Sequence, residues 1–297
     1  SLFSYFCGII IVMKHYSMPV NENDLKKLHK LYQNHLVEDD NQYLVFHAKH
    51  NETHVLAYAT GKVLLQGDEV TPELILIKKH LKKVDYDAIG SDEVGTGDVF
   101  GPVVVCTAFV SKEDIPFLEQ LGVKDSKNIS DDDILSIGSK LAQKLTHTLL
   151  IVKPSKYNDL LKKNINLNKM KALLHNQAII KTTSKLNKEY PVIVDQFCQP
   201  NLYYNYLSDE TLVYRNINFY TKAESIHLAV AAASIIARYA FLLKMRELSK
   251  SIGFELRKGA SSLVDDQIEL IVEKHGESIL HSIAKLNFKN ITKRQVS

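Results

Sequence analysis

The chain has 297 residues, which is enough for one large domain or for two of ordinary size. Hydrophobic residues make up 45% and charged residues 24%, a composition that is typical of a globular protein and excludes a disordered one. The formal net charge of +3 is too small to indicate a class of partner. Cys7, Cys106 and Cys198 are far apart, which excludes a disulfide framework and a zinc site, so we expect a reducing, cytoplasmic setting.

The apolar stretch SLFSYFCGIIIVM at the start of the sequence is shorter than the roughly 20 residues that a transmembrane helix needs. It has no basic region before it and no small-residue cleavage site after it, so we expect neither a signal peptide nor membrane association. We predict a β-branched strand over residues 9–15. Two interpretations stay open for the residues before Gly8: an over-extended start or an unstructured end.

The first eighty-odd residues predict a small α+β domain. Leucines recur at helical spacing over residues 22–34, and Asn21 or Asn23 is expected to cap this helix. Three hairpin-linked strands and a second helix follow, and they are expected at residues 43–47, 53–59, 63–66 and 72–83. The charged stretch KKHLKKVDYD then marks the predicted boundary between a domain of residues 1–83 and a domain of residues 84–297.

Beyond this boundary, predicted strands alternate with predicted helices. The strands are expected at residues 88–91, 99–110, 148–152, 190–197 and 215–220. The helices are expected at residues 130–145, in a lysine-rich region of residues 153–188, at residues 223–250 and near the chain's end. Ser130 is the expected N-cap of the first of these helices. The predicted fold class is therefore α/β, a mixed sheet flanked by helices and preceded by the small α+β domain.

Acidic residues stand where predicted strands and helices begin or end. Asp92 and Glu93 close one strand, and Asp195 closes a β-branched run. Glu224 opens the alanine-rich helix. A lone acid in such a place is commonly a cap or a turn residue, or it stabilises a helix dipole. Several acids in this placement, with no arginine near Asp195 in the sequence, instead favour a site for hard divalent cations such as Mg²⁺.

The adjacent acids pose a geometric problem, because successive side chains of a regular strand point to opposite faces of the sheet. Asp92 and Glu93 reach a common metal site only if the strand breaks there, and we expect such a break beside Gly95 and Gly97. Asp98, past the bend, is predicted to be a turn residue. The alanines after Glu224 leave little bulk, so we expect that helix to pack closely against another backbone.

Four motifs follow one another within residues 89–241: GSDEVGTGDVFGP, KDSKNIS, VIVDQF and TKAESIHLAVAAASIIARYAF. Together they resemble the ribonuclease HIII group of the bacterial type 2 ribonuclease H family. The resemblance implies an RNase H-like fold and an N-terminal domain similar to the TATA-binding-protein fold, whose hairpin YATGKVLLQG resembles. It also implies an endonuclease that cleaves the RNA strand of RNA/DNA hybrids and leaves 5′-phosphate and 3′-hydroxyl ends.

The resemblance further implies roles for single residues. The catalytic ligands of two divalent cations, Mg²⁺ or Mn²⁺, would be four carboxylates: Asp92, Glu93, Asp195 and Glu224. The backbone that recognises the RNA 2′-hydroxyl groups would be that of Gly95, Thr96 and Gly97. Three residues are expected near the phosphates, with ordinary surface polarity as the alternative: Ser126, Lys127 and Lys222.

Two residues separate the chain from the sister ribonuclease HII group. That group carries arginine at the position of Thr96 and usually aspartate at the position of Glu224. Both differences favour the ribonuclease HIII group and put in doubt incision at single embedded ribonucleotides, the speciality of the sister group, which stays the alternative function. A non-catalytic hybrid-binding protein is a further alternative, but it predicts a missing carboxylate, and all four are present.

Two basic blocks could be solvated helix faces or could bind a polyanion. Nine lysines stand against two acids from Lys153 to Glu189, and four basic residues with no acid stand from Lys285 to Arg294. Given the resemblance, we expect at least part of them to contact the backbone of a hybrid. The N-terminal sheet is expected to be a second contact surface or a structural cap. We expect no membrane and no obligate protein partner, with a monomer as the default.

Overall fold

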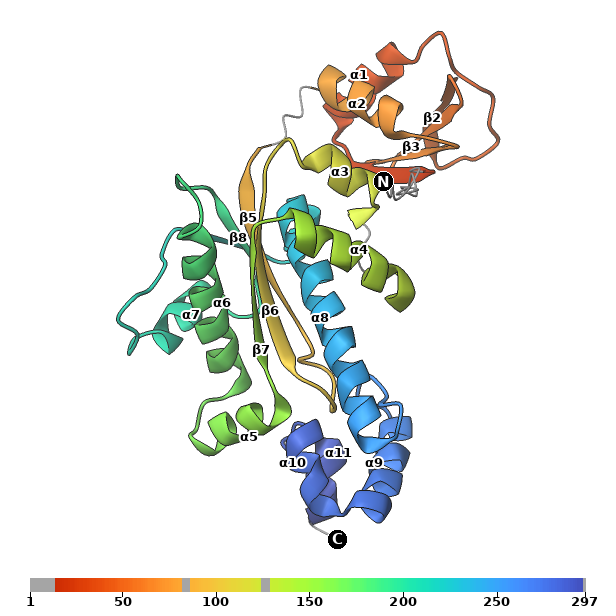
Figure 1. Ribbon diagram of the computed structural model, residues 1–297. Helices are drawn as coiled ribbons and strands as arrows, with labels where there is room; N and C mark the ends of the chain where they lie inside the picture. Colours follow the sequence, from red (N-terminus) through yellow and green to blue (C-terminus); the bar gives the residue numbers. More distant parts are fainter. Residues whose placement is uncertain (1–13, 82–85, 124–128, 296–297) are drawn as a thin grey trace, which may run out of the picture. The chain divides into compact units, whose positions relative to one another are not determined.

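The computed structural model describes residues 14–81, 86–123 and 129–295 (Figure 1). The chain divides into two compact units. One contains residues 1–86 and 112–123, and the other contains residues 87–111 and 124–297. Residues 112–123 thus group with the N-terminal unit although they follow two strands of the second unit.

The N-terminal unit is a four-stranded antiparallel sheet with helices. The sheet order is β1-β4-β3-β2, with bounds β1 (His15–Pro19), β2 (Leu44–His50), β3 (Thr53–Tyr58) and β4 (Lys62–Gly67). The helices are α1 (Glu22–Leu31), α2 (Thr71–His80) and α3 (Ile115–Gln120). Asn21 caps α1 as predicted, because its Oδ1 accepts the amide of Asp24 at 2.8 Å. Most of the strand predicted at residues 9–15 lies outside the described residues, and β1 begins only at His15.

The second unit contains a five-stranded mixed sheet of order β7-β6-β5-β8-β9. Its strands are β5 (Ala88–Val94), β6 (Val103–Val110), β7 (His147–Val152), β8 (Val192–Asp195) and β9 (Ile217–Tyr220). The first three pair antiparallel, whereas β8 pairs parallel with β5 and β9 parallel with β8. The predicted mixed sheet is confirmed.

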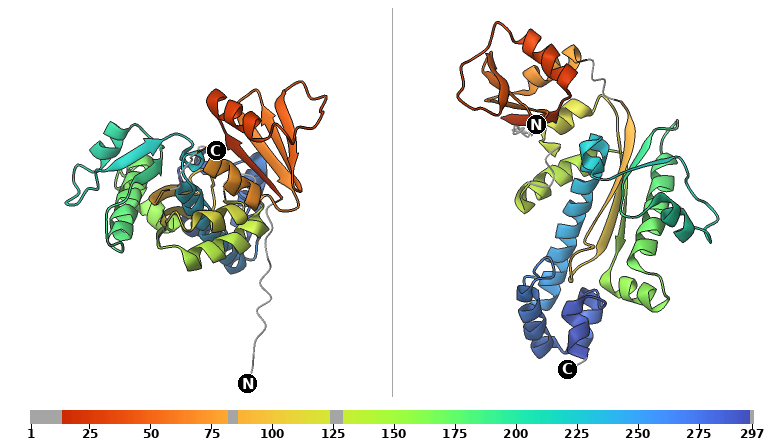
Figure 2. Two further views of the ribbon diagram at one scale, coloured as in Figure 1. Left: turned by 90° about the horizontal axis from the view of Figure 1, so that it is seen from above. Right: turned by 180° about the vertical axis from the view of Figure 1, so that it is seen from behind.

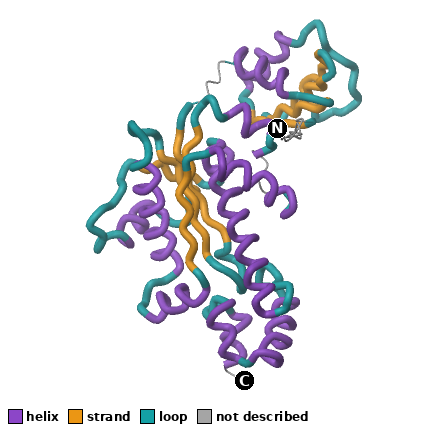
Figure 3. Tube along the Cα trace, viewed as in Figure 1, coloured by secondary structure: helices purple, strands orange, loops and turns teal. Residues whose placement is uncertain are grey.

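Helices cover both faces of this sheet (Figures 1 and 3). The helices of this unit, whether or not they cover the sheet, are α4 (Asp131–Lys144), α5 (Pro154–Lys162), α6 (Leu167–Thr183), α7 (Pro200–Tyr206), η2 (Ala223–Ser225), α8 (Leu228–Ile252), α9 (Ser262–His275), η3 (Glu277–Ile279), α10 (Leu280–Ile283), α11 (Lys289–Thr292) and η4 (Lys293–Gln295). The view from behind shows α8 on one face and α6 on the other (Figure 2). Ser130 caps α4 as predicted, with its Oγ accepting the amide of Asp133.

The alanine-rich helix α8 packs directly on the central strand β5, as predicted. A Cβ atom at Gly90 would lie 2.2 Å from the backbone carbon of Ala229 and 2.2 Å from the amide nitrogen of Val230. The absence of a side chain on the strand and the small side chains on the helix thus permit backbone contact. By length and apolar composition α8 would qualify as a membrane span, but 67% of its most apolar stretch is buried, as in a core helix.

The helix predicted at residues 223–250 is wrong at its start. Residues 223–225 form the separate 3₁₀ turn η2, and α8 begins at Leu228. The physical reason is local capping, because the Nδ1 atom of His227 accepts the amide of Ala229 at 3.0 Å. Lys222, before the turn, has a left-handed backbone with φ 56°. Glu224 therefore belongs to a turn between β9 and α8 rather than to a long helix.

Candidate active site

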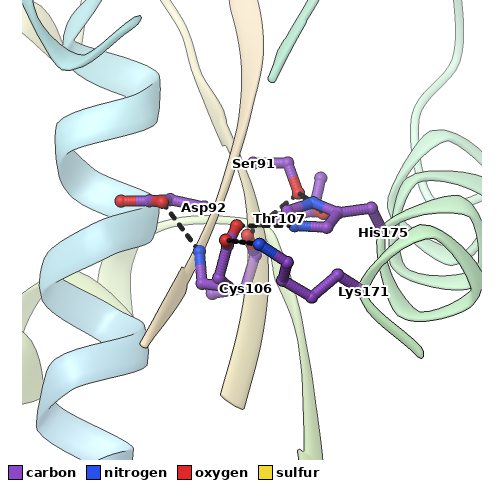
Figure 4. A network of polar contacts seen from close by, with 7 residues as sticks. Ser91, Asp92, Cys106, Thr107, Lys171 and His175 are labelled. Atoms are coloured by element: carbon purple, nitrogen blue, oxygen red, sulfur yellow. Dashed lines mark hydrogen bonds and ion pairs between the residues drawn. The ribbon is translucent and has the colours of Figure 1, made fainter. Parts of the chain in front are cut away.

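Asp92 and Asp195 lie beside each other on neighbouring parallel strands. The pairs Ile89–Val192 and Ser91–Val194 set the register of β5 and β8, so the two acids are at the next position along each strand. Both side chains are partly buried. Figure 4 shows Asp92 directed towards the helix α8.

The environment of Asp92 is strongly unfavourable for an isolated negative charge. Burial, together with the charges of Glu93 and Asp195, raises the pKa of Asp92 above its usual range, although a hydrogen bond from Ser234 on α8 opposes the shift. The amide of Glu93 also donates to Asp92 Oδ1 at 2.7 Å. A hard divalent cation would compensate this concentration of carboxylate charge, so the chemistry of the donors fits such an ion.

Glu93 occupies the opposite face of the sheet. Its two oxygens contact Lys171 Nζ and His175 Nε2, each at 3.0 Å, and both partners come from α6. Burial opposes ionisation of Glu93, but His175 and then Lys171 outweigh it and lower the pKa of the carboxyl. Lys171 and His175 are four residues apart, the spacing that places two side chains on one face of a helix.

The expected break of the strand at the paired acids is wrong. β5 continues to Val94, and its pairing with β6 runs unbroken through Asp92–Cys106 and Glu93–Val105. The ladder hydrogen bonds hold the pleat, so the two side chains diverge. The chain bends one residue later, at Gly95, where φ is 90°.

A buried polar network extends from His175, the partner of Glu93, to Ser91 and Thr107 (Figure 4). The Nδ1 atom of His175 lies 2.7 Å from the Ser91 hydroxyl, which in turn lies 2.8 Å from the Thr107 hydroxyl. His175 is fully buried, and the Lys171 ammonium lies 4.2 Å from the centre of the Phe197 ring. Neither Lys171 nor His175 was predicted as a site residue. Their helical spacing within the lysine-rich region was the available signal.

Asp195 is tied to the turn that carries Glu224. The amide of Ala223 donates to Asp195 Oδ1 at 2.8 Å, so residue 224 follows directly on an anchored position. The amide of Gln196 donates to the carbonyl of Tyr220 at 3.0 Å and joins the ends of β8 and β9, next to the turn. Glu224 is partly buried.

The four predicted carboxylates are thus brought to one region but do not converge fully. Among the described residues, no three histidine, cysteine, aspartate or glutamate side chains form an arrangement that could hold a metal ion. Asp92 and Asp195 are adjacent, and Glu224 follows the residue bound to Asp195. Glu93 faces Lys171 and His175 on the other side of β5.

The glycine bend, residues 95–97, begins just beyond Glu93. Gly95 is buried, and a Cβ atom there would lie 2.1 Å from the carbonyl oxygen of Pro102. Gly97 is exposed, and a Cβ atom there would meet no atom within 4 Å. Thr96 between them is partly exposed. The outer part of the bend is therefore open to an approaching molecule.

Of the three residues expected near the phosphates, Lys222 lies in the described part of the chain. Lys222 is exposed beside Glu224, whereas Ser126 and Lys127 lie outside the described residues. Asp98 is more than a turn residue, because its Oδ1 accepts the amide of Gly259 at 2.6 Å.

In the basic block of residues 285–294, Lys289 is exposed, but the other three basic residues are buried or contact acids. Lys285 is fully buried. Lys293 pairs with Asp265 at 2.5 Å, and Arg294 contacts Glu269 and Glu277. The side chain of Lys285 is enclosed by protein and so does not contact a nucleic acid, whereas the exposed Lys289 leaves the expectation for part of the block a prediction. In the other block, seven lysines are exposed: Lys153, Lys156, Lys162, Lys163, Lys181, Lys185 and Lys188.

Comparisons with known proteins agree with this architecture. The family model described as Ribonuclease HII matches residues 89–291, and a domain of unknown function, DUF3378, matches residues 15–73. Ribonuclease HIII of Phytoplasma mali is 48% identical over 284 residues, covering 95% of this chain and 99% of the relative. Ribonuclease HIII of Bacillus subtilis is 40% identical over 305 residues, covering 95% and 97%.

Solved structures show the same relationship. The crystal structure of Bst-RNase HIII in complex with Mn²⁺ matches with a TM-score of 0.72 and 34% identity, covering 95% of this chain and 98% of that one. The structure of Aquifex aeolicus RNase H3 matches with a TM-score of 0.56 and 26% identity, covering 92% and 100%. From its sequence motifs, its mixed sheet and these similarities, the chain belongs to the ribonuclease HIII family.

Proposed function

We propose that this protein is a metal-dependent endoribonuclease that cleaves the RNA strand of RNA/DNA hybrids and leaves 5′-phosphate and 3′-hydroxyl ends. The observation that carries the proposal is the placement of Asp92 beside Asp195 at adjacent strand positions, with Glu224 in the turn anchored to Asp195. A set of neighbouring carboxylates of this kind suits the hydrolysis of a phosphodiester assisted by divalent cations.

We propose Asp92, Asp195 and Glu224 as the residues that hold the Mg²⁺ or Mn²⁺ ions, whereas Glu93, the fourth predicted ligand, lies on the other face of β5 against Lys171 and His175. The Mn²⁺ complex of Bst-RNase HIII supports this choice of metal. When bound, such ions activate water and stabilise developing negative charge on phosphate oxygens. The chain's own contribution is orientation, because the Ala223 amide fixes Asp195 while Lys171 and His175 fix Glu93.

Substrate recognition is proposed for two surfaces. In the catalytic domain of residues 84–297, the backbone of Gly95, Thr96 and Gly97 would contact 2′-hydroxyl groups, which distinguish RNA from DNA. The openness around Gly97 supports this role. Near the phosphates we propose Ser126, Lys127 and Lys222. The N-terminal domain of residues 1–83 would contact the same hybrid.

The cellular setting is proposed to be the cytoplasm, with the protein acting as a monomer. Light scattering at several protein concentrations measures the mass directly. A dimer mass that persists on dilution would contradict the monomer.

The substitution Asp92→Asn tests the metal site. We expect the rate of hybrid cleavage to fall by more than about a hundredfold, the upper end of the effect of losing a group that only orients metal ligands. Calorimetric titration with Mn²⁺ should show weaker binding, and fluorescence anisotropy should show retained hybrid binding. Unimpaired cleavage by this variant would overturn the assignment.

Matched substrates separate the two enzymatic alternatives. Wild-type protein is given a continuous RNA/DNA hybrid and a DNA duplex that contains one ribonucleotide. We expect efficient cleavage of the hybrid and poor incision of the duplex. Preference for the single ribonucleotide would instead favour the activity of the sister ribonuclease HII group.

The N-terminal surface is tested by Tyr43→Ala, since this tyrosine is 66% exposed and directly precedes the edge strand β2. The KM for the hybrid should rise and kcat should stay within about twofold, because the substitution removes binding that ground state and transition state share. An unchanged KM would remove Tyr43 from the proposed contact surface.

A further inference from the structure

The chain leaving the glycine bend is held by a buried lysine from the far end of the sequence. Lys285 has no exposed surface, and its Nζ donates to the carbonyl oxygens of Asp98 and Gly101, both at 2.7 Å. The carbonyl of Phe100 lies at 3.4 Å from the same nitrogen. One side chain therefore contacts three of the four carbonyls in the segment of residues 98–101.

Backbone contacts reinforce this attachment. The amide of Lys285 donates to the carbonyl of Val99 at 2.8 Å, and the amide of Gly101 donates to that of Ile283 at 2.9 Å. From the other side, Gly259 donates its amide to Asp98 Oδ1 and accepts the amide of Val99 at 3.0 Å. The segment is thus anchored by two loops that are distant from it in sequence.

Burying a lysine here is costly, which indicates that packing alone does not explain it. Burial lowers the pKa of Lys285 to about 7, with the Asp98 charge acting in the opposite direction. An apolar side chain would avoid that cost but would leave the carbonyls of Asp98 and Gly101 buried without this donor. The buried lysine is therefore explained by its hydrogen bonds to the carbonyl oxygens of Asp98 and Gly101.

The segment it holds controls the glycine bend. Glycine has the largest conformational freedom of any residue, so residues 95–97 cannot keep a fixed geometry unaided. Their entry is fixed by β5 and by the close contact of Gly95 with Pro102 and Phe241. Their exit is the segment bound to Lys285, while Gly97 between these anchors stays open.

We infer that Lys285 is a positioning residue that holds the glycine bend in the geometry needed to distinguish an RNA strand from a DNA strand. The inference rests on the proposed role of residues 95–97 in contacting 2′-hydroxyl groups. A bend fixed before binding loses less entropy on contact, so its donors and acceptors discriminate between sugars more sharply. Asp98, bound to Gly259, completes the attachment on the exposed side.

The test compares Lys285→Met with Lys250→Met, a control that removes an exposed lysine at the end of α8 for which no polar contact is described. Fluorescence anisotropy gives the affinity for an RNA/DNA hybrid and for a DNA duplex of the same sequence. For Lys285→Met we expect the affinity ratio between them to fall by about threefold to tenfold, the order expected from losing hydrogen bonds of ordinary strength. The control should keep the wild-type ratio.

Cleavage provides the second readout. Hybrids with a single 2′-deoxynucleotide beside the cleaved bond measure how much the enzyme depends on the 2′-hydroxyl. In Lys285→Met we expect the KM for the unmodified hybrid to rise and kcat to change less than about twofold. The penalty for the deoxynucleotide should shrink.

A merely structural role would give a different pattern. It would lower the melting temperature and the active fraction but leave both the affinity ratio and the deoxynucleotide penalty unchanged, and that result would overturn the inference. If Lys285→Met does not fold, Asp98→Ala takes its place, because it removes the second anchor from a partly exposed residue. An unchanged affinity ratio in Asp98→Ala would equally overturn it. The affinity ratio does not depend on cleavage. A wild-type protein that binds hybrids selectively but does not cut them would therefore contradict the proposed function and leave the inference about Lys285 standing.

Discussion

Substituting alanine for Gly90 tests the contact between β5 and α8 on which the arrangement of the site depends. The added Cβ would lie 2.2 Å from backbone atoms of Ala229 and Val230 and 2.4 Å from the Ala229 carbonyl oxygen. Carbon atoms in contact lie about 3.5–4.0 Å apart, so the strand and helix would have to separate by more than about 1 Å. Neither neighbour is a flexible side chain, so relaxation must move backbone.

The magnitude follows from this displacement. Overpacking a core typically costs about 1–3 kcal/mol, and backbone contacts place Gly90→Ala at the upper end. For a unit of this size, about 3 kcal/mol corresponds to a melting temperature lower by about 6–12 °C. Cleavage should also fall at temperatures where the variant is folded, because β5 carries Asp92 and α8 follows the turn that carries Glu224.

Gly97→Ala is the matched control for stability. A Cβ atom at Gly97 would meet nothing within 4 Å, so its melting temperature should stay within about 1–2 °C of wild type. Thermal unfolding followed by circular dichroism compares both variants with wild type. If Gly90→Ala unfolds at the wild-type temperature, the backbones of β5 and α8 are not in contact as described, and the reasoning fails.

Two further predictions concern the C-terminal part of the second unit. Asn158→Ala removes hydrogen bonds to residues 281, 284 and 286 from a buried side chain, so urea unfolding should show a loss of about 2–4 kcal/mol, with Asn158→Asp intermediate. The stability of wild type relative to Lys285→Met should rise with pH above about 7, because the folded-state pKa of Lys285 is lowered to about 7 and the unfolded chain then binds more protons. The slope should reach at most about 1.4 kcal/mol per pH unit between there and the unfolded pKa, and urea unfolding from pH 6.5 to pH 8.5 measures it. A difference in stability that does not vary with pH would contradict the lowered pKa.

Local patterns in the sequence predicted much of the fold. Asn21 and Ser130 cap the helices that they were expected to cap, because capping depends on a side chain and an amide three residues away. The β-branched run before Asp195 is a buried strand in the interior of the sheet, between β5 and β9. The short helices α3 and α7 were not predicted, since six and seven residues are too few for a clear helical period.

Within the candidate site, the sequence indicated the residue types and the strand ends, but it did not indicate to which face of the sheet each side chain points. Whether Asp92 and Glu93 share a face depends on the pairing of β5 with β6, which continues past both acids. The partners of Glu93 on α6 are 78 and 82 residues away in the chain, and they were not predicted.

Lys285 shows most clearly the difference between what the sequence predicts and what only the tertiary structure decides. In the sequence it belongs to the same basic block as Lys289, and nothing local separates them. In the folded chain Lys289 is exposed, whereas Lys285 is enclosed and bound to carbonyls nearly two hundred residues earlier. The sequence by itself determined the α/β class, the caps and the positions of the acids, because these follow from short-range periodicity and side-chain chemistry. Only the tertiary structure decided which acids lie together and which cation is buried, because both depend on long-range pairing and burial.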